Sequence, residues 1–333
     1  MQTVAEAANV STATVSHVIN KTRKVSPETE RAVLEAIERV GYTPNRLASS
    51  LAGARTRTVG VAIAALSNHY FSSVVHAIEA ECARRGLMML LADTHENPDH
   101  ELKVVRELHE RRVDGILIAP TADPSHRTLA WLRDRGVPTV LVDRFVGREF
   151  DQIAVEGRQA ARTLVEHVVA LGHRRIAFIS GAPGLSTTQE RLEGYEAALG
   201  DAGIALDPAL VERGESQIEP AAQAVRRVLA LRSPPTAIVT GNNLMTLGAL
   251  RALREARLEI PRDVSLVCFD DFDWAELFSP PLTVMAQPVE ELGTKAVAML
   301  AARIEAPEGK RRSVRLPPQM RVRSSAARPA RAR

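Results

Sequence analysis

Nine polar or aromatic residues lie close to the ends of predicted strands, where open parallel sheets bind their ligands. Eight of them follow apolar runs, and the ninth opens a helix. They are Asn68, Tyr70, Phe71, Asp143, Arg144, Arg191, Asn242, Asp270 and Gln287. Carboxylates and amides bind neighbouring hydroxyl groups in pairs, guanidinium groups bridge two oxygens, and aromatic rings cover C–H faces. The set suits a sugar, although each residue taken singly is equally consistent with a turn, a helix cap or an ion pair.

A second set of residues, near the N-terminus, has the chemistry of base and phosphate recognition. A predicted helix over 12–19 turns Val15, Val18 and Ile19 inward. Its other face, with the loop beyond it, presents Thr12, Ala13, Ser16, His17, Asn20 and Arg23. Small polar groups and an imidazole can approach base edges in a major groove, and an arginine can bind both acceptors of guanine. Solvated residues on a plain three-helix bundle would give the same pattern.

The first fifty residues predict short helices and no strand. Ser11 is placed to cap the helix over 12–19, and Ser26-Pro27-Glu28 is a strong helix start. The helix after Ser26 places Val33, Leu34, Ile37 and Val40 on one side and stops at Gly41. A further short helix is predicted over 45–51. Three helices with a tight turn between the first two predict an all-α helix-turn-helix head.

From Val59 onward, apolar runs alternate with amphipathic helical stretches. The runs are 59–64, 88–91, 115–119, 139–142, 175–180, 237–240 and 264–269. Continuous apolar runs joined by helices indicate parallel sheets covered on both faces. So many units predict two α/β lobes with doubly wound parallel sheets, the first ending near 143–154. We therefore divide the chain into a DNA-binding head (1–44), a hinge helix and linker (45–57), a sensor (58–323) and a disordered basic tail (324–333).

Charge is distributed unevenly along the 333 residues. The net charge of +3 combines +3 over 1–58, +8 over 303–333 and −8 between them. Basic ends on an acidic centre suit a polyanionic partner. Cys82 and Cys268 lie far apart in apolar surroundings and are interpreted as buried thiols. No apolar stretch is long enough to span a bilayer, and the N-terminus shows no charged-then-apolar signal pattern. We therefore expect a cytoplasmic protein.

Enzymatic motifs are absent from the sequence. The loop Gly181-Ala-Pro-Gly184 lacks the lysine and spacing of a phosphate-binding loop, and Ser180 and Ser186 lack the context of a nucleophile. The nine histidines show no metal-ligand spacing. We therefore expect no catalysis, cofactor or metal. A sugar-capture protein of a transporter would need a signal peptide and would have no use for the head.

The segment ANVSTATVSHVINKTR (8–23) resembles the recognition segment of the LacI/GalR family of transcriptional regulators, closest to its purine and ribose repressors. VSPET (25–29), GYTPNRLA (41–48) and Leu51 match as well. The resemblance implies that His17 and Arg23 read bases, that Thr12, Ser16 and Asn20 hold the duplex, and that 45–51 is a hinge helix with Asn45, Ala48 and Leu51 at the minor groove. Ala13 stands where the purine repressor has a hydroxyl. Family members have a few residues before the position of Met1, so we expect an upstream start in the natural protein.

The sensor is similar to the periplasmic-binding-protein-like domain of the same family. The resemblance implies that eight of the nine strand-end residues listed first, all except Tyr70, correspond to positions that bind sugar in the ribose-binding branch. We therefore expect a repressor controlled allosterically by a monosaccharide such as a pentose. Two departures are His69 in place of a proline and Ser216 in place of an aromatic residue. A purine effector is the alternative, although Leu185 stands where the purine repressor has an arginine.

The resemblance also implies a homodimer on a pseudo-palindromic operator. No leucine heptads follow the sensor, so a dimer is the simpler expectation than a tetramer. We expect its interface to use apolar helix faces of the sensor, including the helix that starts near Tyr70.

Leu51 is expected to act as an apolar wedge between base pairs, because unstacking a step bends the duplex toward more protein contacts. Leu51→Ala should lose specific operator affinity while keeping salt-sensitive, nonspecific DNA binding, both measured by fluorescence anisotropy. Unchanged specific affinity would argue against the wedge.

Overall fold

The computed structural model describes residues 1–20, 23–42, 55–64 and 66–330. These fall into two compact units, Met1–Thr56 and Arg57–Arg333, which we describe separately. The predicted hinge residues Asn45, Ala48 and Leu51 lie outside the described residues. No helix within the described ranges combines the length and apolar character needed to cross a membrane.

The first unit is a bundle of three helices. They are α1 (Gln2–Ala7), α2 (Thr12–Asn20) and α3 (Pro27–Val40). Val4, Val15 and Val33 are fully buried between them. Two helices of six and nine residues would be marginal in isolation, so this small apolar core holds the bundle together.

Local capping sets the helix boundaries of the first unit, as the sequence predicts. Ser11 Oγ accepts from the amide of Thr14 at 3.1 Å, and Ser26 Oγ accepts from the amide of Thr29 at 3.2 Å. Gly41 ends α3 in the left-handed conformation (φ 61°). These caps satisfy backbone groups that a helix end leaves unpaired.

Two residues predicted for the core of the first unit lie outside it. Leu34 is 50% exposed and Val40 is 37% exposed. The helix packs instead through Val33 and Ala36, with Ile37 partly buried. Because α3 contacts short neighbours, its buried stripe is narrower than the apolar stripe of the sequence.

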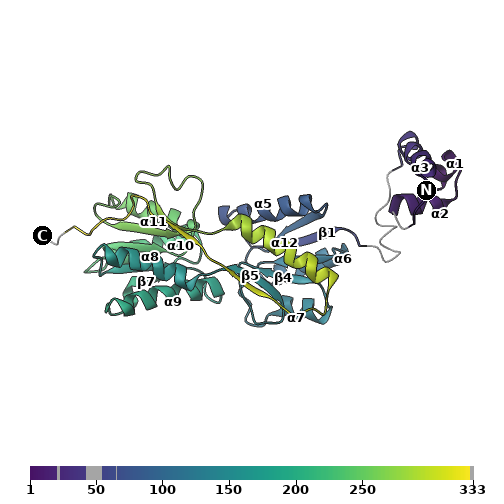
Figure 1. Ribbon diagram of the computed structural model, residues 1–333. Helices are drawn as coiled ribbons and strands as arrows, with labels where there is room; N and C mark the ends of the chain where they lie inside the picture. Colours follow the sequence, from purple (N-terminus) through teal and green to yellow (C-terminus); the bar gives the residue numbers. More distant parts are fainter. Residues whose placement is uncertain (21–22, 43–54, 65, 331–333) are drawn as a thin grey trace. The chain divides into compact units, whose positions relative to one another are not determined.

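The second unit consists of two lobes, each built on a six-stranded sheet (Figure 1). The strands of the first sheet are, in spatial order, β2 (Met88–Asp93), β1 (Thr58–Ile63), β3 (Gly115–Ile118), β4 (Thr139–Val142), β5 (Asp151–Val155) and β11 (Ser313–Leu316). Those of the second are β7 (Val211–Arg213), β6 (Ile176–Ser180), β8 (Ala237–Thr240), β9 (Ser265–Phe269), β10 (Thr283–Ala286) and β12 (Gln319–Arg321). The two sheets therefore have the same strand order, and the doubly wound prediction is confirmed.

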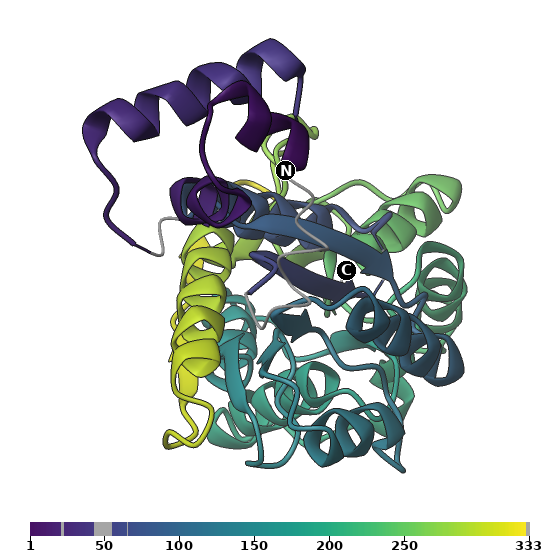
Figure 2. The same cartoon turned by 90° about the vertical axis from the view of Figure 1, so that its right-hand side faces the viewer.

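Helices cover both faces of the first sheet (Figure 2). On one side lie α5 (His69–Arg84) and α12 (Val289–Glu305), and on the other α6 (Pro98–Glu110) and α7 (Arg127–Asp134). Val59, Val61 and Ile63 of β1 face the first pair, whereas Ala62 faces the second. Alternate residues of one strand thus enter two cores, which is why the strand reads as a continuous apolar run.

The second lobe repeats this layering. One face of its sheet packs against α8 (Arg158–Ala170) and α9 (Ser186–Asp201). The other packs against α10 (Ile218–Leu229) and α11 (Asn243–Glu255). Tyr195 of α9 is fully buried, and its hydroxyl donates to the carbonyl of Ile176 at 2.9 Å.

The chain crosses between the lobes three times, after β5, after β10 and after β11. The sequence predicted one crossing near 143–154 and did not anticipate that α12 and β11 return to the first lobe. The strands β5, β7, β11 and β12 were also missed. β12 is antiparallel to β10, because β10 runs toward the cleft and β12 starts at the cleft after the last crossing.

The prediction of a disordered basic tail is wrong for residues 324–330. Ser325 is fully buried; its hydroxyl donates to the carbonyl of Leu266 at 2.6 Å and accepts from the amide of Thr283 at 2.8 Å. Further along, the carbonyl of Ala327 lies 2.8 Å from a ring nitrogen of His173. Backbone and hydroxyl hydrogen bonds, which composition does not reveal, fix the segment on the second lobe.

The two cysteines are buried and unpaired, as interpreted from the sequence. Burial raises the pKa of the Cys82 thiol to about 11 and that of the Cys268 thiol to about 12. Both therefore stay protonated and unreactive near neutral pH.

A buried ion pair joins α12 to β5 in the first lobe. Arg303 Nε lies 2.8 Å from Asp151 Oδ2, and the amide of Arg312 donates to Asp151 Oδ1 at 2.7 Å. Burial alone would raise the pKa of the Asp151 carboxyl, but these donors outweigh burial and hold the pKa below its usual value. The pair secures the returning helix that covers the sheet beneath the cleft.

Asp151→Asn should lower the free energy of unfolding by about 3 kcal/mol, because it leaves Arg303 buried without its counter-charge. Urea denaturation measures this. The control, Asp134→Asn, removes an exposed pair with Arg133 and should cost at most about 1 kcal/mol. Equal losses in the two variants would contradict a structural role for the buried pair.

Candidate functional site

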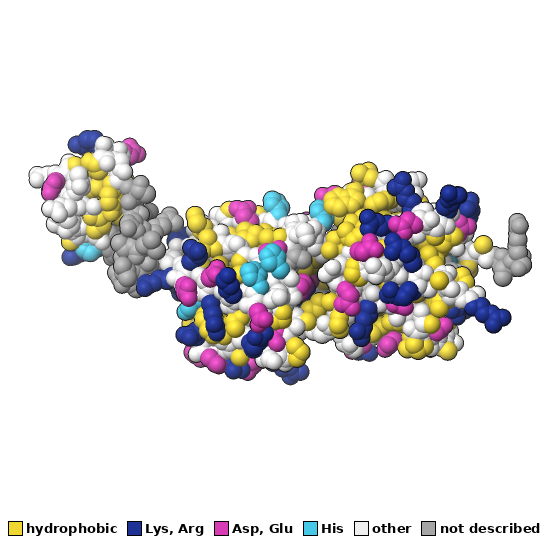
Figure 3. Space-filling model, turned by 180° about the vertical axis from the view of Figure 1, so that it is seen from behind, with side chains coloured by type: hydrophobic (Ala, Val, Ile, Leu, Met, Phe, Trp, Pro, Cys, Tyr) yellow, Lys and Arg dark blue, Asp and Glu magenta, His cyan; other side chains and the backbone are white. Residues whose placement is uncertain are grey.

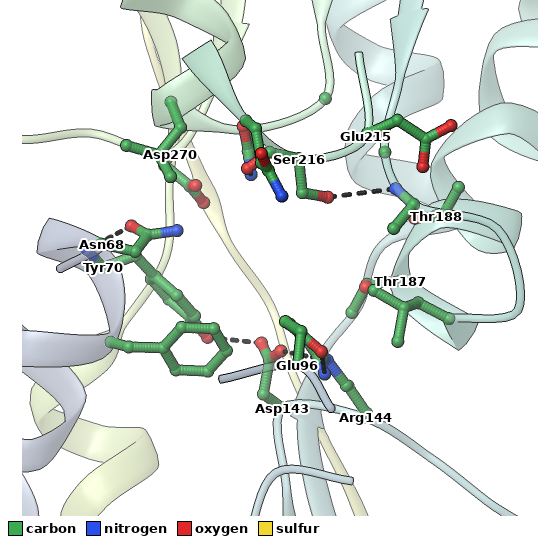
Figure 4. Close-up of a pocket in the computed structure, with 18 of the residues that line it drawn as sticks. Asn68, Tyr70, Glu96, Asp143, Arg144, Thr187, Thr188, Glu215, Ser216 and Asp270 are labelled. Atoms are coloured by element: carbon green, nitrogen blue, oxygen red, sulfur yellow. Dashed lines mark hydrogen bonds and ion pairs between the residues drawn. The ribbon is translucent and has the colours of Figure 1, made fainter. Parts of the chain in front are cut away.

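All nine residues singled out at the strand ends line one cavity of about 720 Å³ between the two lobes. The first lobe contributes Asn68, Tyr70, Phe71, Asp143 and Arg144, and the second contributes Arg191, Asn242 and Asp270, with Gln287 on the crossing segment. Figure 4 shows these walls facing one another, with α5 on one side and the start of α9 on the other. The parallel sheets produce this arrangement, since their carboxyl ends meet at the cleft.

The start of α5 forms the aromatic wall. Asn68 caps this helix, with its Oδ1 accepting from the amide of Tyr70 at 3.0 Å. Tyr70 and Phe71 are both buried, and their rings lie 5.2 Å apart at an angle of 59°. The Tyr70 hydroxyl donates to Asp143 Oδ1 at 2.7 Å. Burial and the adjacent Asp143 carboxylate raise the pKa of Tyr70 well above its usual value, so the hydroxyl remains a donor.

Asp143 and Asp270 occupy equivalent positions in the two lobes. Asp143 follows β4 and Asp270 follows β9, and both have left-handed backbones (φ 70° and 72°). The amide of Asp143 donates to the carbonyl of Ile153 at 2.9 Å, and that of Asp270 to the carbonyl of Met285 at 3.1 Å. The left-handed conformation is uncommon outside glycine, and here the same strand-end geometry holds one carboxylate in each lobe.

Two arginines lie beside these carboxylates. Arg144 pairs with Glu96 through both terminal nitrogens and donates to the carbonyl of Pro120 at 2.8 Å. Its Nε lies 3.6 Å from Asp143 Oδ2. The guanidinium carbon of Arg191 lies over the ring of Phe269, 3.7 Å from the ring centre. Each lobe therefore offers a carboxylate together with a guanidinium group.

Three buried polar atoms of these residues have no hydrogen-bond partner among the residues that the structure describes. They are Arg144 Nε, Arg191 Nε and Gln287 Oε1. The Nε2 of the same Gln287 amide group donates to Asp270 Oδ1. Because buried polar groups are nearly always paired, two donors and one acceptor without partners in one cavity indicate a polar ligand.

Burial raises the pKa of the Asp270 carboxyl, and the charge of Asp143 adds to the effect. Arg191, Gln287 and the amide of Asn243 act in the opposite direction, the amide donating to Asp270 Oδ2 at 3.1 Å. The ionised carboxylate is therefore costly in the unliganded cavity, and hydroxyl donors would stabilise it.

Asn242 lines the cavity and also serves as a helix cap. It caps α11, with its Oδ1 accepting from the amide of Met245 at 2.8 Å, and its Nδ2 is 3.4 Å from the carbonyl of Ser216. Its amide oxygen is thus used by the backbone. The role of helix cap, which was one alternative for each strand-end residue, therefore applies to the Oδ1 atoms of both Asn242 and Asn68.

The sequence missed several residues that line the cavity. They are Ser67, Asp93, His95, Glu96, Ala122, Phe178, Thr187, Thr188, Glu215, Gln217, Ile218, Glu219 and Leu244, with the loop Gly181 and Ala182. Asp93 is the last residue of β2 and Glu96 lies in the turn that follows, so the rule that identified the others could have found them. Glu215 follows a strand of only three residues, which leaves no apolar run to mark it. Among the described residues, no group of three or more side chains is arranged to hold a metal ion.

In the first unit, the side chains of α2 divide into a buried face and an outward face, as predicted. Val15 and Val18 are buried, whereas Thr12 and Ala13 are exposed and Ser16 and His17 are half-buried. Asn20 is the last residue of the helix, and its side chain lies outside the described atoms. Arg23, beyond the helix, is exposed. At 100° per residue the candidate positions of the helix cover one continuous face.

A three-helix head with an exposed second helix, followed by a two-lobed sensor with a polar cavity, defines a ligand-responsive DNA-binding regulator. Residues 1–45 match the model of bacterial regulatory proteins of the lacI family, and residues 165–326 match a periplasmic binding protein-like domain. The chain is 34% identical over 326 residues to the HTH-type transcriptional repressor PurR of Photobacterium profundum, covering 97% of both chains. It belongs to the lacI family and is a transcriptional regulator, not an enzyme.

Solved structures agree with this assignment. The lac repressor dimer bound to operator and the anti-inducer ONPF superposes with a TM-score of 0.86 at 30% identity, over 97% of this chain and 98% of that one. A LacI family regulator from Enterococcus faecium with bound ribose gives a TM-score of 0.74 at 27% identity, over 81% and 99%. The family predicted from the sequence and the fold class are thereby confirmed.

Asp270→Asn should stabilise the unliganded protein at pH 8, because it removes a buried charge. A raised pKa means that the penalty of the ionised carboxyl disappears as the pH falls through that value. The gap in melting temperature between the variant and wild type should therefore narrow from pH 8 to pH 5. Asp201→Asn, on the exposed end of α9, should show a small, constant gap. A gap that widens at low pH would contradict this assignment of the Asp270 charge.

Proposed function

We propose that the protein is a homodimeric repressor of a pseudo-palindromic operator, and that a monosaccharide such as a pentose, bound between the lobes, controls its operator affinity. The single observation behind the choice of effector is the pair of carboxylates, Asp143 and Asp270, that face each other from equivalent strand ends beside Arg144 and Arg191.

A sugar ring fits this donor and acceptor set. Each carboxylate can accept from neighbouring hydroxyls, and the guanidinium groups of Arg144 and Arg191 and the amide group of Gln287, which line the cavity, can form hydrogen bonds with others. Phe71 supplies an apolar surface for the C–H face.

A purine is the second candidate, and the PurR names of whole-length relatives favour it. A flat base is best held between parallel aromatic faces, and the rings of Tyr70 and Phe71 are tilted by 59°. The buried Leu185 occupies the position where, by resemblance, the purine repressor has an arginine. These features support the sugar over the base.

For DNA reading, we propose that α2 enters the major groove. His17 and Arg23 would contact base edges, and Thr12, Ser16 and Asn20 would contact the duplex around them, with Ala13 close to the groove. The predicted hinge residues Asn45, Ala48 and Leu51 would contact the minor groove between the two heads.

A second copy of the chain would place two heads on the two half-sites. The apolar face of α5 packs inside its own lobe, through Val74 and Ile78, and is not available to a partner. Exposed apolar side chains lie instead on the edge strand β2 (Met88, 59% exposed) and after β9 (Leu277, 78% exposed). Figure 3 shows hydrophobic side chains at the surface of both lobes, among intermingled basic and acidic groups. We propose that the partner copy covers such residues.

Effector and operator would be coupled through the angle between the lobes. A ligand bound by both walls stabilises one relative position of the lobes, and the chain crosses between them three times. The effector can change operator affinity only as far as its affinities for the two arrangements differ.

Thermal shift of the full chain against pentoses, hexoses, hypoxanthine and guanine tests the effector class. We expect pentoses to raise the melting temperature and to change affinity for an inverted-repeat operator, measured by anisotropy. Asp143→Asn should weaken sugar binding roughly 10- to 100-fold, because a charged hydrogen-bond acceptor is lost, without changing operator affinity in the absence of sugar.

Asp134→Asn, an equal charge change on α7 outside the cavity, is the matched control. Binding of a base but of no sugar would establish the second candidate. Full sugar affinity in Asp143→Asn would refute the proposed site.

A further inference from the structure

The cavity between the lobes contains more carboxylates than cations. Two guanidinium groups line it, those of Arg144 and Arg191. The carboxylates are Asp93, Glu96, Asp143, Glu215, Glu219 and Asp270. Glu219 is matched by Arg226 and Arg251 from outside the cavity. Asp93 lies 3.4 Å from a ring nitrogen of His95. With Glu219 and Asp93 set aside, four carboxylates remain for two guanidinium groups.

Both guanidinium groups lie beside acceptors of the protein itself. Arg144 is held by both oxygens of Glu96 and lies against Asp143. Arg191 donates to the carbonyl of Gly241, and its charge is felt by the buried Asp270. Each cation therefore already faces protein acceptors of its own.

Glu215 adds a charge that nothing compensates. It has no hydrogen bond or ion pair with any described residue, and it lies on the cavity wall next to Ser216 (Figure 4). Its backbone is left-handed (φ 51°), as is that of Ser216 (φ 56°). Asp93, in contrast, accepts from the amides of Leu66 and His95 at 3.0 and 2.8 Å, and its Oδ1 lies 3.4 Å from a ring nitrogen of His95.

The buried groups of the cavity already sense one another's charge. The carboxylates of Asp143 and Asp270 both act to raise the pKa of Tyr70, after burial, and Asp143 acts to raise that of Asp270. A further negative charge would add to this repulsion while losing its own hydration. Hydroxyl groups would face no such penalty.

Size would not exclude a charged ligand. A volume of about 720 Å³ is in the range of pockets that enclose whole small-molecule ligands, so a pentose and its phosphate ester both fit. Discrimination between them has to come from charge.

We propose that this cavity selects an uncharged ligand, and that for the sugar effector proposed above, on which this inference rests, it accepts the free sugar and rejects the phosphate ester. The regulator then senses the sugar before phosphoryl transfer to one of its hydroxyls. A sugar kinase is accordingly the class of enzyme that would remove the effector.

Titration calorimetry of the full-length protein with D-ribose and D-ribose 5-phosphate tests the inference. At 50 mM salt the ester should bind at least ~100-fold more weakly, since like charges brought together cost several kcal/mol. Because salt screens charges, the ratio of the two affinities should fall at 500 mM salt.

Glu215→Gln should reduce the affinity ratio roughly threefold, as one like charge is removed. Glu196→Gln makes the same change on the exposed side of α9, away from the cavity, and should leave the ratio unaltered. Inosine and inosine 5′-monophosphate form a second pair that differs by one phosphate group.

Equal binding of ribose and its ester would overturn the inference, and so would a ratio insensitive to salt, which would mean steric exclusion. If no free sugar binds, the proposed function fails. The inosine pair then still decides the charge argument: binding of the nucleoside alone supports it, and equal binding of the nucleotide overturns it.

Discussion

The carboxyl ends of two parallel sheets meet at one cleft, and the remaining features of the sensor depend on this constraint. Strands of a parallel sheet all end at the same edge, so residues far apart in sequence converge there. Asp143 and Asp270 end equivalent strands of the two lobes in the same left-handed backbone conformation. One carboxylate from each lobe is thus held in place by backbone geometry, before any side-chain contact is made.

The cavity is less stable than an apolar core would be. Burial of Asp270 raises its pKa, and Arg144, Arg191 and Gln287 each keep a polar atom without a partner in the described part of the chain. These costs are offset elsewhere, by fully apolar cores on both faces of each sheet and by the buried pair of Asp151 with Arg303. A polar ligand that satisfies the open groups would recover part of this cost.

The two units are stabilised in different ways. The head is small, and its short helices rely on caps at Ser11 and Ser26 and on a core of valines. Its exposed helix face can therefore be polar without loss of stability. The sensor is large enough to bury several uncompensated polar atoms, which a bundle of three short helices could not tolerate.

The sequence by itself determined the features that depend on neighbours in the chain. Caps at Ser11, Ser26 and Gly41, the apolar runs of the central strands, and the strand-end positions of Asp143 and Asp270 all follow from local patterns. Only the tertiary structure decided the rest. The return of α12 and β11 to the first lobe, the pairing of Glu96 with Arg144 and the burial of Ser325 join residues tens to hundreds of positions apart. Periodicity and composition report on nearest neighbours, whereas these contacts arise from the packing of complete lobes.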